Sequence, residues 1–137
     1  MDFTYLLTPG VAWLFAGATK FLINSARARR WAFGQIGYGG LPSNHTAIVT
    51  SMATLIGLKA GVDHPAFGVA IALAVIVILD ASSLRMQIGK HAKTINLLVK
   101  NNNYQAPTLR EKMGHTSIEI FAGAIVGICV AVGMAKI

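Results

Sequence analysis

Two histidines of this chain stand where helices are expected to begin, and the first is His45. The stretch from Tyr38 to Ala47, YGGLPSNHTA, has Gly39 and Gly40 for a tight bend and then Ser43 and Asn44, which are favoured helix N-cap types. An apolar helix is expected to follow, with His45 in its first turn. Free backbone N–H groups and the positive end of the helix dipole bind anions, phosphate especially, at such a start. His45 is therefore a candidate proton donor or nucleophile, or more plainly a polar residue at a membrane interface.

The second histidine, His115, is followed four residues later by Glu119. This spacing puts both side chains on one face of a helix, within reach of a hydrogen bond. A glutamate that holds one imidazole nitrogen leaves the other free and basic, as a nucleophilic or base histidine requires. The alternative is a purely structural pair at a helix start.

Cationic side chains accompany the two histidines. Lys20 stands near the end of the first apolar stretch, Arg27 follows it, and Arg85 follows Asp80. Each has a plain explanation as well. Lys20 can extend its amine to the membrane surface, and Arg27 can serve as a topology signal. Asp80 and Arg85 can simply pair with each other.

The composition indicates which class of protein must position these residues. Of 137 residues, 54% are hydrophobic and 12% are charged, and the net charge is +7. The chain is too apolar for an ordinary soluble protein, and its length suits a single domain, residues 1–137. Because the basic residues lie between apolar runs, anionic lipid or a phosphate substrate is expected as partner, and nucleic acid is not. The single Cys129 excludes a disulfide framework and a cysteine zinc site.

Four apolar stretches are predicted to be membrane helices. They run from about Phe3 to Asn24, Thr46 to Val62, Pro65 to Leu79 and Ser117 to Ala135. Runs of about 20 residues are long enough to cross a bilayer. The pairs Gly57/Gly61 and Gly123/Gly127 have the small-xxx-small spacing of closely packed membrane helices.

A further helix is predicted between the third and fourth stretches. Ile88, Ala92, Ile95 and Val99 fall on one helical stripe, with the lysines away from it. This pattern predicts an amphipathic helix that lies in the membrane interface. The predicted fold is therefore all-α, a polytopic membrane bundle of about four transmembrane helices plus an interfacial amphipathic helix.

The basic residues also predict the topology. The two links rich in Lys and Arg, residues 24–41 and 84–114, are expected on the cytoplasmic side, with both termini outside. Four polar clusters then meet at the inner face of a plasma (inner) membrane, where anionic lipids are further expected partners. They are Lys20–Arg30, Ser43–His45, Asp80–Arg85 and His115–Glu119. Because four spans, two of them with small-residue faces, bury little core for one chain, at least a homodimer is predicted.

Together these residues resemble motifs of the type-2 phosphatidic acid phosphatase superfamily, which includes vanadium haloperoxidases. Lys20 and Arg27 match its Lys and Arg separated by six residues, and PSNH (residues 42–45) matches its Pro-Ser-Gly-His motif. Arg85, His115 and Glu119 are similar to the Arg, His and acid of its third motif.

The chain more closely resembles a small divergent branch of this superfamily, in which the Gly-Gly-x-Pro-Ser-x-His stretch and the Asp80–Arg85 segment are typical. It differs from the superfamily pattern at several positions. Ala28 stands where Pro is preferred, Asn44 replaces Gly, and Glu119 replaces Asp. Residues 86–114 separate Arg85 from His115, where the superfamily has only a few residues.

The resemblance implies a phosphatase that acts on a lipid-linked phosphate, such as a phosphatidate, a phosphatidylglycerophosphate or a polyprenyl phosphate. His115 would form a phosphohistidine, Glu119 would orient it, and His45 would protonate the leaving group. The phosphate-binding residues would be Lys20, Arg27, Ser43, Asn44 and Arg85, with Asp80 and Gly40 in support.

No cofactor or metal is predicted, because the carboxylates of the inner face are widely spaced. Two alternatives remain. One is a non-catalytic protein that binds or transports lipid phosphates, and the other is a structural bundle that assembles as an oligomer.

Overall fold

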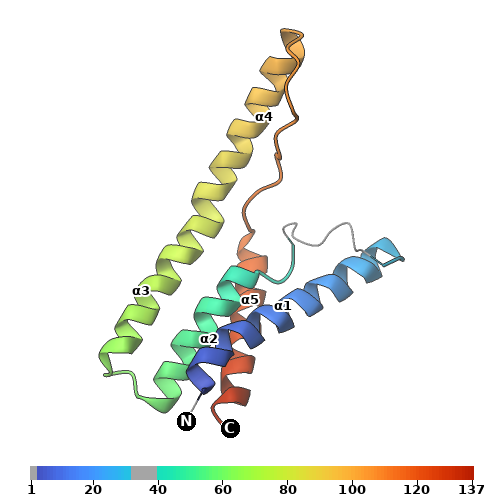
Figure 1. Ribbon diagram of the computed structural model, residues 1–137. Coiled ribbons are helices and arrows are strands. Elements are labelled where there is room, and N and C mark those ends of the chain that lie inside the picture. Colours follow the sequence, from blue (N-terminus) through green and yellow to red (C-terminus); the bar gives the residue numbers. More distant parts are fainter. Residues whose placement is uncertain (1–2, 32–39) are drawn as a thin grey trace.

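A computed structural model describes residues 3–31 and 40–137 of the chain (Figure 1). Every regular element in these ranges is helical. The elements are α1 (Thr4–Ala28), α2 (Asn44–Lys59), α3 (Pro65–Leu79), the π-helical segment η2 (Asp80–Leu84), α4 (Arg85–Asn101) and α5 (Ser117–Met134). The prediction of an all-α fold is confirmed. Gly39, half of the expected tight bend, lies outside the described residues.

Helix α2 lies at the centre of the bundle, and α1, α3 and α5 each pack against it (Figure 1). The residues buried between the helices are mostly small. On the helices around α2 they are Thr4, Thr8, Ala12 and Ala16 on α1, Ala70 and Ala74 on α3, and Gly123, Gly127 and Ala131 on α5. Helix α2 itself also buries the larger Val49, Leu55 and Ile56. Large apolar side chains instead face outward, for example Phe15 at 60% exposure and Phe121 at 68%. Small residues inside and large apolar residues outside are expected of helices that associate within lipid.

Among the described residues, three helices are long and apolar enough to cross a membrane. They are Thr4–Ala28, the continuous helix Pro65–Asn101 and Ser117–Met134. Helix α2 has 16 residues, which span about 24 Å at the rise of an α-helix. The helices follow the predicted order. Helix α2 is shorter than α1, α5 and the continuous helix Pro65–Asn101. Both termini lie at the same end of the bundle, as the alternating topology predicted (Figure 1).

Glycines let α5 approach α2 closely. A Cβ atom on Gly123 would meet the carbonyl oxygen of Ser43, and one on Gly127 would meet the hydroxyl of Thr50. The packing role predicted for this pair is confirmed. The same prediction for Gly61 was wrong, because α2 ends at Lys59 and Gly61 lies in the following turn with a φ of 91°. Gly57 does pack, since a Cβ there would lie 3.1 Å from the ring of Phe67 on α3.

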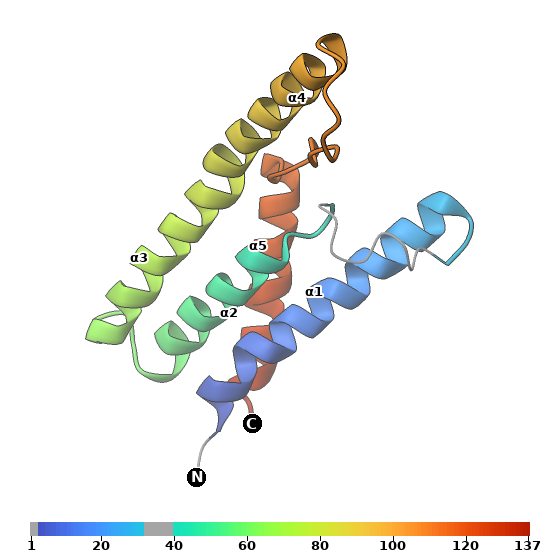
Figure 2. The same cartoon turned by 45° about the horizontal axis from the view of Figure 1, so that its top comes forward.

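Helix α4 continues α3 and forms one long rod with it (Figures 1 and 2). The combined helix has 37 residues and is about 56 Å long, nearly twice the ~30 Å hydrocarbon core of a bilayer. Sequence reasoning expected α4 to turn away and lie in the membrane interface, which the structure does not show. The sequence DASSL has no Gly or Pro to break the backbone, and the Arg85 N–H bonds to the Asp80 carbonyl across η2. The helix therefore passes through this segment without a bend into the membrane plane.

Candidate active site

The N-terminal ends of α2 and α5 are joined directly to each other. The Ser43 N–H donates to the Glu119 carbonyl oxygen over 2.9 Å, and the Ser43 carbonyl lies against Gly123. The Ser43 hydroxyl accepts from the Thr46 N–H at 3.3 Å and so caps α2, as predicted. This side chain has no exposed surface, which does not fit the direct phosphate contact expected of it. The two helix starts, with their free N–H groups, therefore face the same region.

His115 is buried and oriented by a carboxylate. Its Nδ1 lies 3.2 Å from Glu119 Oε2, and the ring is only 8% exposed. The same Oε2 accepts from the Thr116 N–H at 3.0 Å, and the Thr116 hydroxyl accepts from the Glu119 N–H at 3.4 Å. This capping box fixes the carboxylate, which in turn favours the proton on Nδ1 of His115. The remaining nitrogen, Nε2, then carries a free lone pair, so His115 is suited to attack an electrophile.

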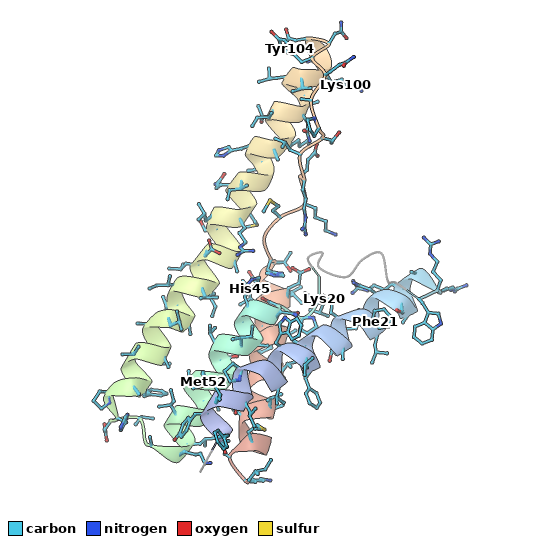
Figure 3. All side chains as sticks on the ribbon, viewed as in Figure 1. Lys20, Phe21, His45, Met52, Lys100 and Tyr104 are labelled. Atoms are coloured by element: carbon cyan, nitrogen blue, oxygen red, sulfur yellow. The ribbon has the colours of Figure 1, made fainter. Side chains whose placement is uncertain are left out.

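His45 stands beside His115, although His45 is in the first turn of α2 and His115 lies just before α5. Their ring centroids are 6.1 Å apart and the rings are tilted by 57°. His45 is exposed, in contrast to His115. Its charge is influenced by Arg85, His115 and Lys20, so all three lie near it. Figure 3 shows Lys20 of α1 and His45 of α2 close together beside the start of α5. Three of the four predicted polar clusters thus meet here.

The fourth cluster, Asp80–Arg85, is joined to the site through η2. The Ala81 carbonyl accepts from the His115 N–H over 2.9 Å. Arg85 Nε lies 2.9 Å from Asp80 Oδ2, which confirms the expected pair, and this bond leaves the terminal amino groups of Arg85 for an anion. Residues 86–114 form α4 and a segment that runs back along it. Arg85 and His115 are therefore close in space although 29 residues separate them in the sequence.

The other candidate residues differ in how the structure places them. Asn44 opens α2 and lies against Gly17 of α1, with its Oδ1 buried and unpartnered among the described residues. Gly40 has a φ of 142° and lies beside Asn24 of α1. Arg27 is exposed in the last turn of α1. No contact within the described part of the chain links Arg27 to either histidine, and α1 leads away from α5 at this end (Figure 2).

Thr116 is a site residue that sequence reasoning missed. Its signal was nevertheless present, because a threonine three residues before a glutamate and ahead of an apolar run is the pattern of a capping box. Within the described ranges, no group of three or more His, Cys, Asp or Glu side chains is arranged to hold a metal ion.

Comparisons with known proteins identify the family. A family model described as the divergent PAP2 family matches residues 1–130. The chain belongs to the divergent PAP2 family. It is also 32% identical to an uncharacterized membrane protein of Bacillus subtilis (strain 168), YuiD, over 95% of this chain and 92% of that protein. No solved structure matches. With three helices able to cross a bilayer, the chain is an integral membrane protein.

Membership of the divergent PAP2 family bears directly on the arrangement of the site. In this member, Lys20 of α1, His45 of α2, Glu119 of α5 and His115, which lies just before α5, meet at one end of the bundle. Arg85 is connected to them through a π-helical segment and one backbone hydrogen bond. The order of motif residues along the chain is thus compatible with a single site in space.

Proposed function

We propose that this protein is a phosphatase that hydrolyses a lipid phosphate monoester or diphosphate through a phosphohistidine, without a metal ion. The observation that carries the proposal is the geometry of the two histidines. One is buried and held at Nδ1 by a carboxylate, and the other is exposed 6.1 Å from it. Binding of phosphate alone requires cations and N–H donors, whereas an oriented imidazole next to a second imidazole suits nucleophilic and acid catalysis.

The proposed reaction has two steps. His115 Nε2 attacks phosphorus and forms an N–P bond as the P–O bond to the leaving alkoxide breaks, and protonated His45 gives that oxygen its proton. Neutral His45 then takes a proton from water, whose oxygen attacks the phosphohistidine and releases inorganic phosphate and free His115. Lys20 and Arg85 stabilise the charge on the phosphoryl oxygens, together with N–H groups at the starts of α2 and α5.

Glu119 stabilises the charge that develops on His115 during attack. Its Oε2 remains bonded to Nδ1, and the Thr116 N–H holds it in place. The carboxylate therefore keeps one tautomer and one orientation of the ring in the ground state and offsets positive charge in the transition state.

The membrane setting supports a lipid-linked substrate. Large apolar side chains surround the bundle, and the candidate site lies at one end of it, where a phosphate headgroup can reach the helix starts. We place this end at the cytoplasmic face of the plasma membrane, because the two basic links adjoin it. Anionic lipids would gather there against Lys90 and Lys93, which lie nearer the start of α4.

A second candidate function is binding or transport of a lipid phosphate without hydrolysis. The observation that favours it is the bond between Arg85 and Asp80, which places a carboxylate beside one of the cations expected to stabilise the transition state. Arg27, a second expected cation, is also not brought to the histidines.

Replacement of the nucleophile tests the proposal. Purified protein is assayed for phosphate release from a panel of lipid phosphates in the presence of a chelator. His115→Ala should abolish turnover and retain phosphate binding, and Glu119→Gln should lose much of the rate. Vanadate, which resembles five-coordinate phosphorus, should inhibit the wild type. His91→Ala, an exposed histidine of α4, is the matched control and should keep the wild-type rate.

Two outcomes would contradict the proposal. A His115→Ala protein with full activity would exclude the phosphohistidine. If the wild type and the His115→Ala variant both bind a lipid phosphate and neither releases phosphate from it, the binding or transport function is favoured.

A further inference from the structure

Asn96 holds a segment that leads directly to His115. We name residues 104–114, which return from the tip of α4 to α5, the strap. The Asn96 amide nitrogen donates to the Leu109 carbonyl and to Glu111 Oε1, each over 2.9 Å. Its amide oxygen accepts from the Leu109 N–H, also at 2.9 Å. One half-buried side chain therefore makes three hydrogen bonds to a segment that has no regular structure of its own.

The strap also contacts the rod on the N-terminal side of Asn96, between Asn96 and η2. A Cβ atom on Gly89 of α4 would collide with the Glu111 carbonyl, so the two backbones touch there. Gly114 has a φ of 85°, and a Cβ there would come within 2.7 Å of Met86. Next to it, the His115 N–H bonds to the Ala81 carbonyl in η2. The strap thus runs along α4 in a fixed register down to His115.

His115 depends on this register, because its backbone lies outside α5. The N-cap of α5 is Thr116, so His115 belongs to the irregular segment that continues the strap. Arg85 instead opens α4 and is tied to Asp80 across η2. A change in the strap would therefore move the imidazole of His115 and leave Arg85 in place.

We propose that Asn96 is a positioning residue for His115. By fixing the strap to α4, it sets where the His115 ring stands relative to Arg85 and His45. This inference rests on the proposed phosphatase function. It assigns residues 86–114, which separate the Arg and His of the third motif, a role in building the site.

Asn96→Asp is the direct test. It removes both donor bonds and places a second carboxylate against Glu111. A displaced nucleophile should lower kcat by about 10- to 100-fold, whereas KM should change little because Lys20 and Arg85 stay in place. Asn96→Ser, which removes the amide without adding charge, should lower kcat in the same direction and serves if Asn96→Asp does not fold.

Two further variants separate positioning from general damage. Asn96→Asp combined with Glu111→Gln restores a donor–acceptor pair with the polarity reversed, so it should regain most of the lost kcat. Asn102→Asp makes the same chemical change at the end of the same helix, where the amide bonds only to the Leu98 carbonyl of α4. Asn102→Asp should keep the wild-type kcat.

A readout that does not need turnover keeps this proposal distinct from the proposed function. Hydrogen exchange at the His115 amide should be slow in wild type, faster in Asn96→Asp and slow again in the double variant. If the wild type releases no phosphate from any lipid phosphate, the proposed function fails. The exchange pattern, with vanadate bound more weakly by Asn96→Asp, then still supports the positioning role. Unchanged exchange at His115, wild-type kcat in Asn96→Asp, or equal loss in Asn102→Asp would overturn it.

Discussion

At the scale of single residues, the site sets two histidines in different surroundings. His115 is buried and bonded to Glu119, while His45 is exposed, with the charged side chains of Lys20, Arg85 and Asp80 near it. The carboxylate of Glu119 holds the imidazole of His115 in one tautomer and one orientation, and solvent access lets the imidazole of His45 exchange protons with water. This difference is the physical basis for assigning attack to His115 and proton transfer to His45.

Replacement of His45 by alanine should slow hydrolysis according to the leaving group. A lipid alkoxide is a poor leaving group and needs a proton, so the rate of its release should fall by ~10²–10⁴-fold. A nitrophenolate needs little protonation, so p-nitrophenyl phosphate should be affected far less. Phosphate release from both substrates by His45→Ala and wild type measures the difference. Equal loss on both substrates would assign His45 to binding.

Local sequence was sufficient for the residues whose partners are close in the chain. The cap formed by Ser43 and the pairs His115–Glu119 and Asp80–Arg85 were all predictable, because residues a few positions apart at a helix start or within a helix lie close together. The prediction that His115 lies within the helix was wrong, since α5 begins at Ser117. The bonds of His115 to Ala81 and of Asn96 to Leu109 were not. They depend on how a long return segment lies against a helix, which no local pattern specifies.

At the scale of elements, the starts of α2 and α5 are held together by close backbone contact. Ser43 donates to Glu119, and Gly123 and Gly127 leave space for the backbone and side chains of α2. In lipid the hydrophobic effect does not drive helices together, so close packing of small residues contributes much of the association. The glycines of α5 therefore determine both the stability of the bundle and the place where the two histidines meet.

Gly127→Ala should destabilise the protein. The new Cβ would meet the Thr50 hydroxyl and lie 2.5 Å from the Ala47 carbonyl and 3.0 Å from the Ser51 nitrogen, so α2 and α5 must move apart. Overpacking of this kind costs about 1–3 kcal/mol, against a gain of up to about 1 kcal/mol in helix propensity. A lower midpoint of thermal unfolding in mild detergent is expected.

Gly133→Ala is the matched control for this substitution. It lies on the same helix with nothing within 4 Å of its Cβ position, so it should leave the midpoint unchanged or raise it. If Gly127→Ala were as stable as Gly133→Ala, the close contact of α2 and α5 would be wrong.

The helices were predictable from apolar runs and from cap residues, but two features of their connections were not. The π-helical segment at DASSL gives no periodic signal, since one extra residue in a turn hardly alters the pattern. It nevertheless determines that α4 continues α3 and that the Ala81 carbonyl meets His115. The glycine spacing also led to a predicted second helix that was too long at its C-terminal end, because α2 ends at Lys59, before Gly61.

At the scale of the whole molecule, the bundle has two unlike ends. One end holds the start of α1 and the end of α5, and the other holds the starts of α2 and α5 and, beyond them, the projecting rod of α4 with the strap (Figure 1). Figure 3 shows Lys100 and Tyr104 at the tip of this projection, well away from Met52 in the bundle. Because the rod is longer than a hydrocarbon core is thick, α4 is expected to extend beyond the membrane on the side of the histidines.

The rod makes the orientation of the protein testable at two positions. Asp63 lies in the turn before α3, and Asn102 follows the end of α4, so the whole 37-residue helix separates them. The positive-inside rule places Asn102, with the lysines of α4, in the cytoplasm, and Asp63 outside.

Single cysteines are introduced at each position in a Cys129→Ala background. A membrane-impermeant maleimide should label Asp63→Cys in intact cells and Asn102→Cys only after permeabilisation, with Cys129→Ala alone as the unlabelled control. Labelling of Asn102→Cys in intact cells would reverse the orientation and place the histidines at the outer face. The proposed phosphatase would then act on lipid phosphates of the outer leaflet, so this measurement also decides which pool of substrate the site can reach.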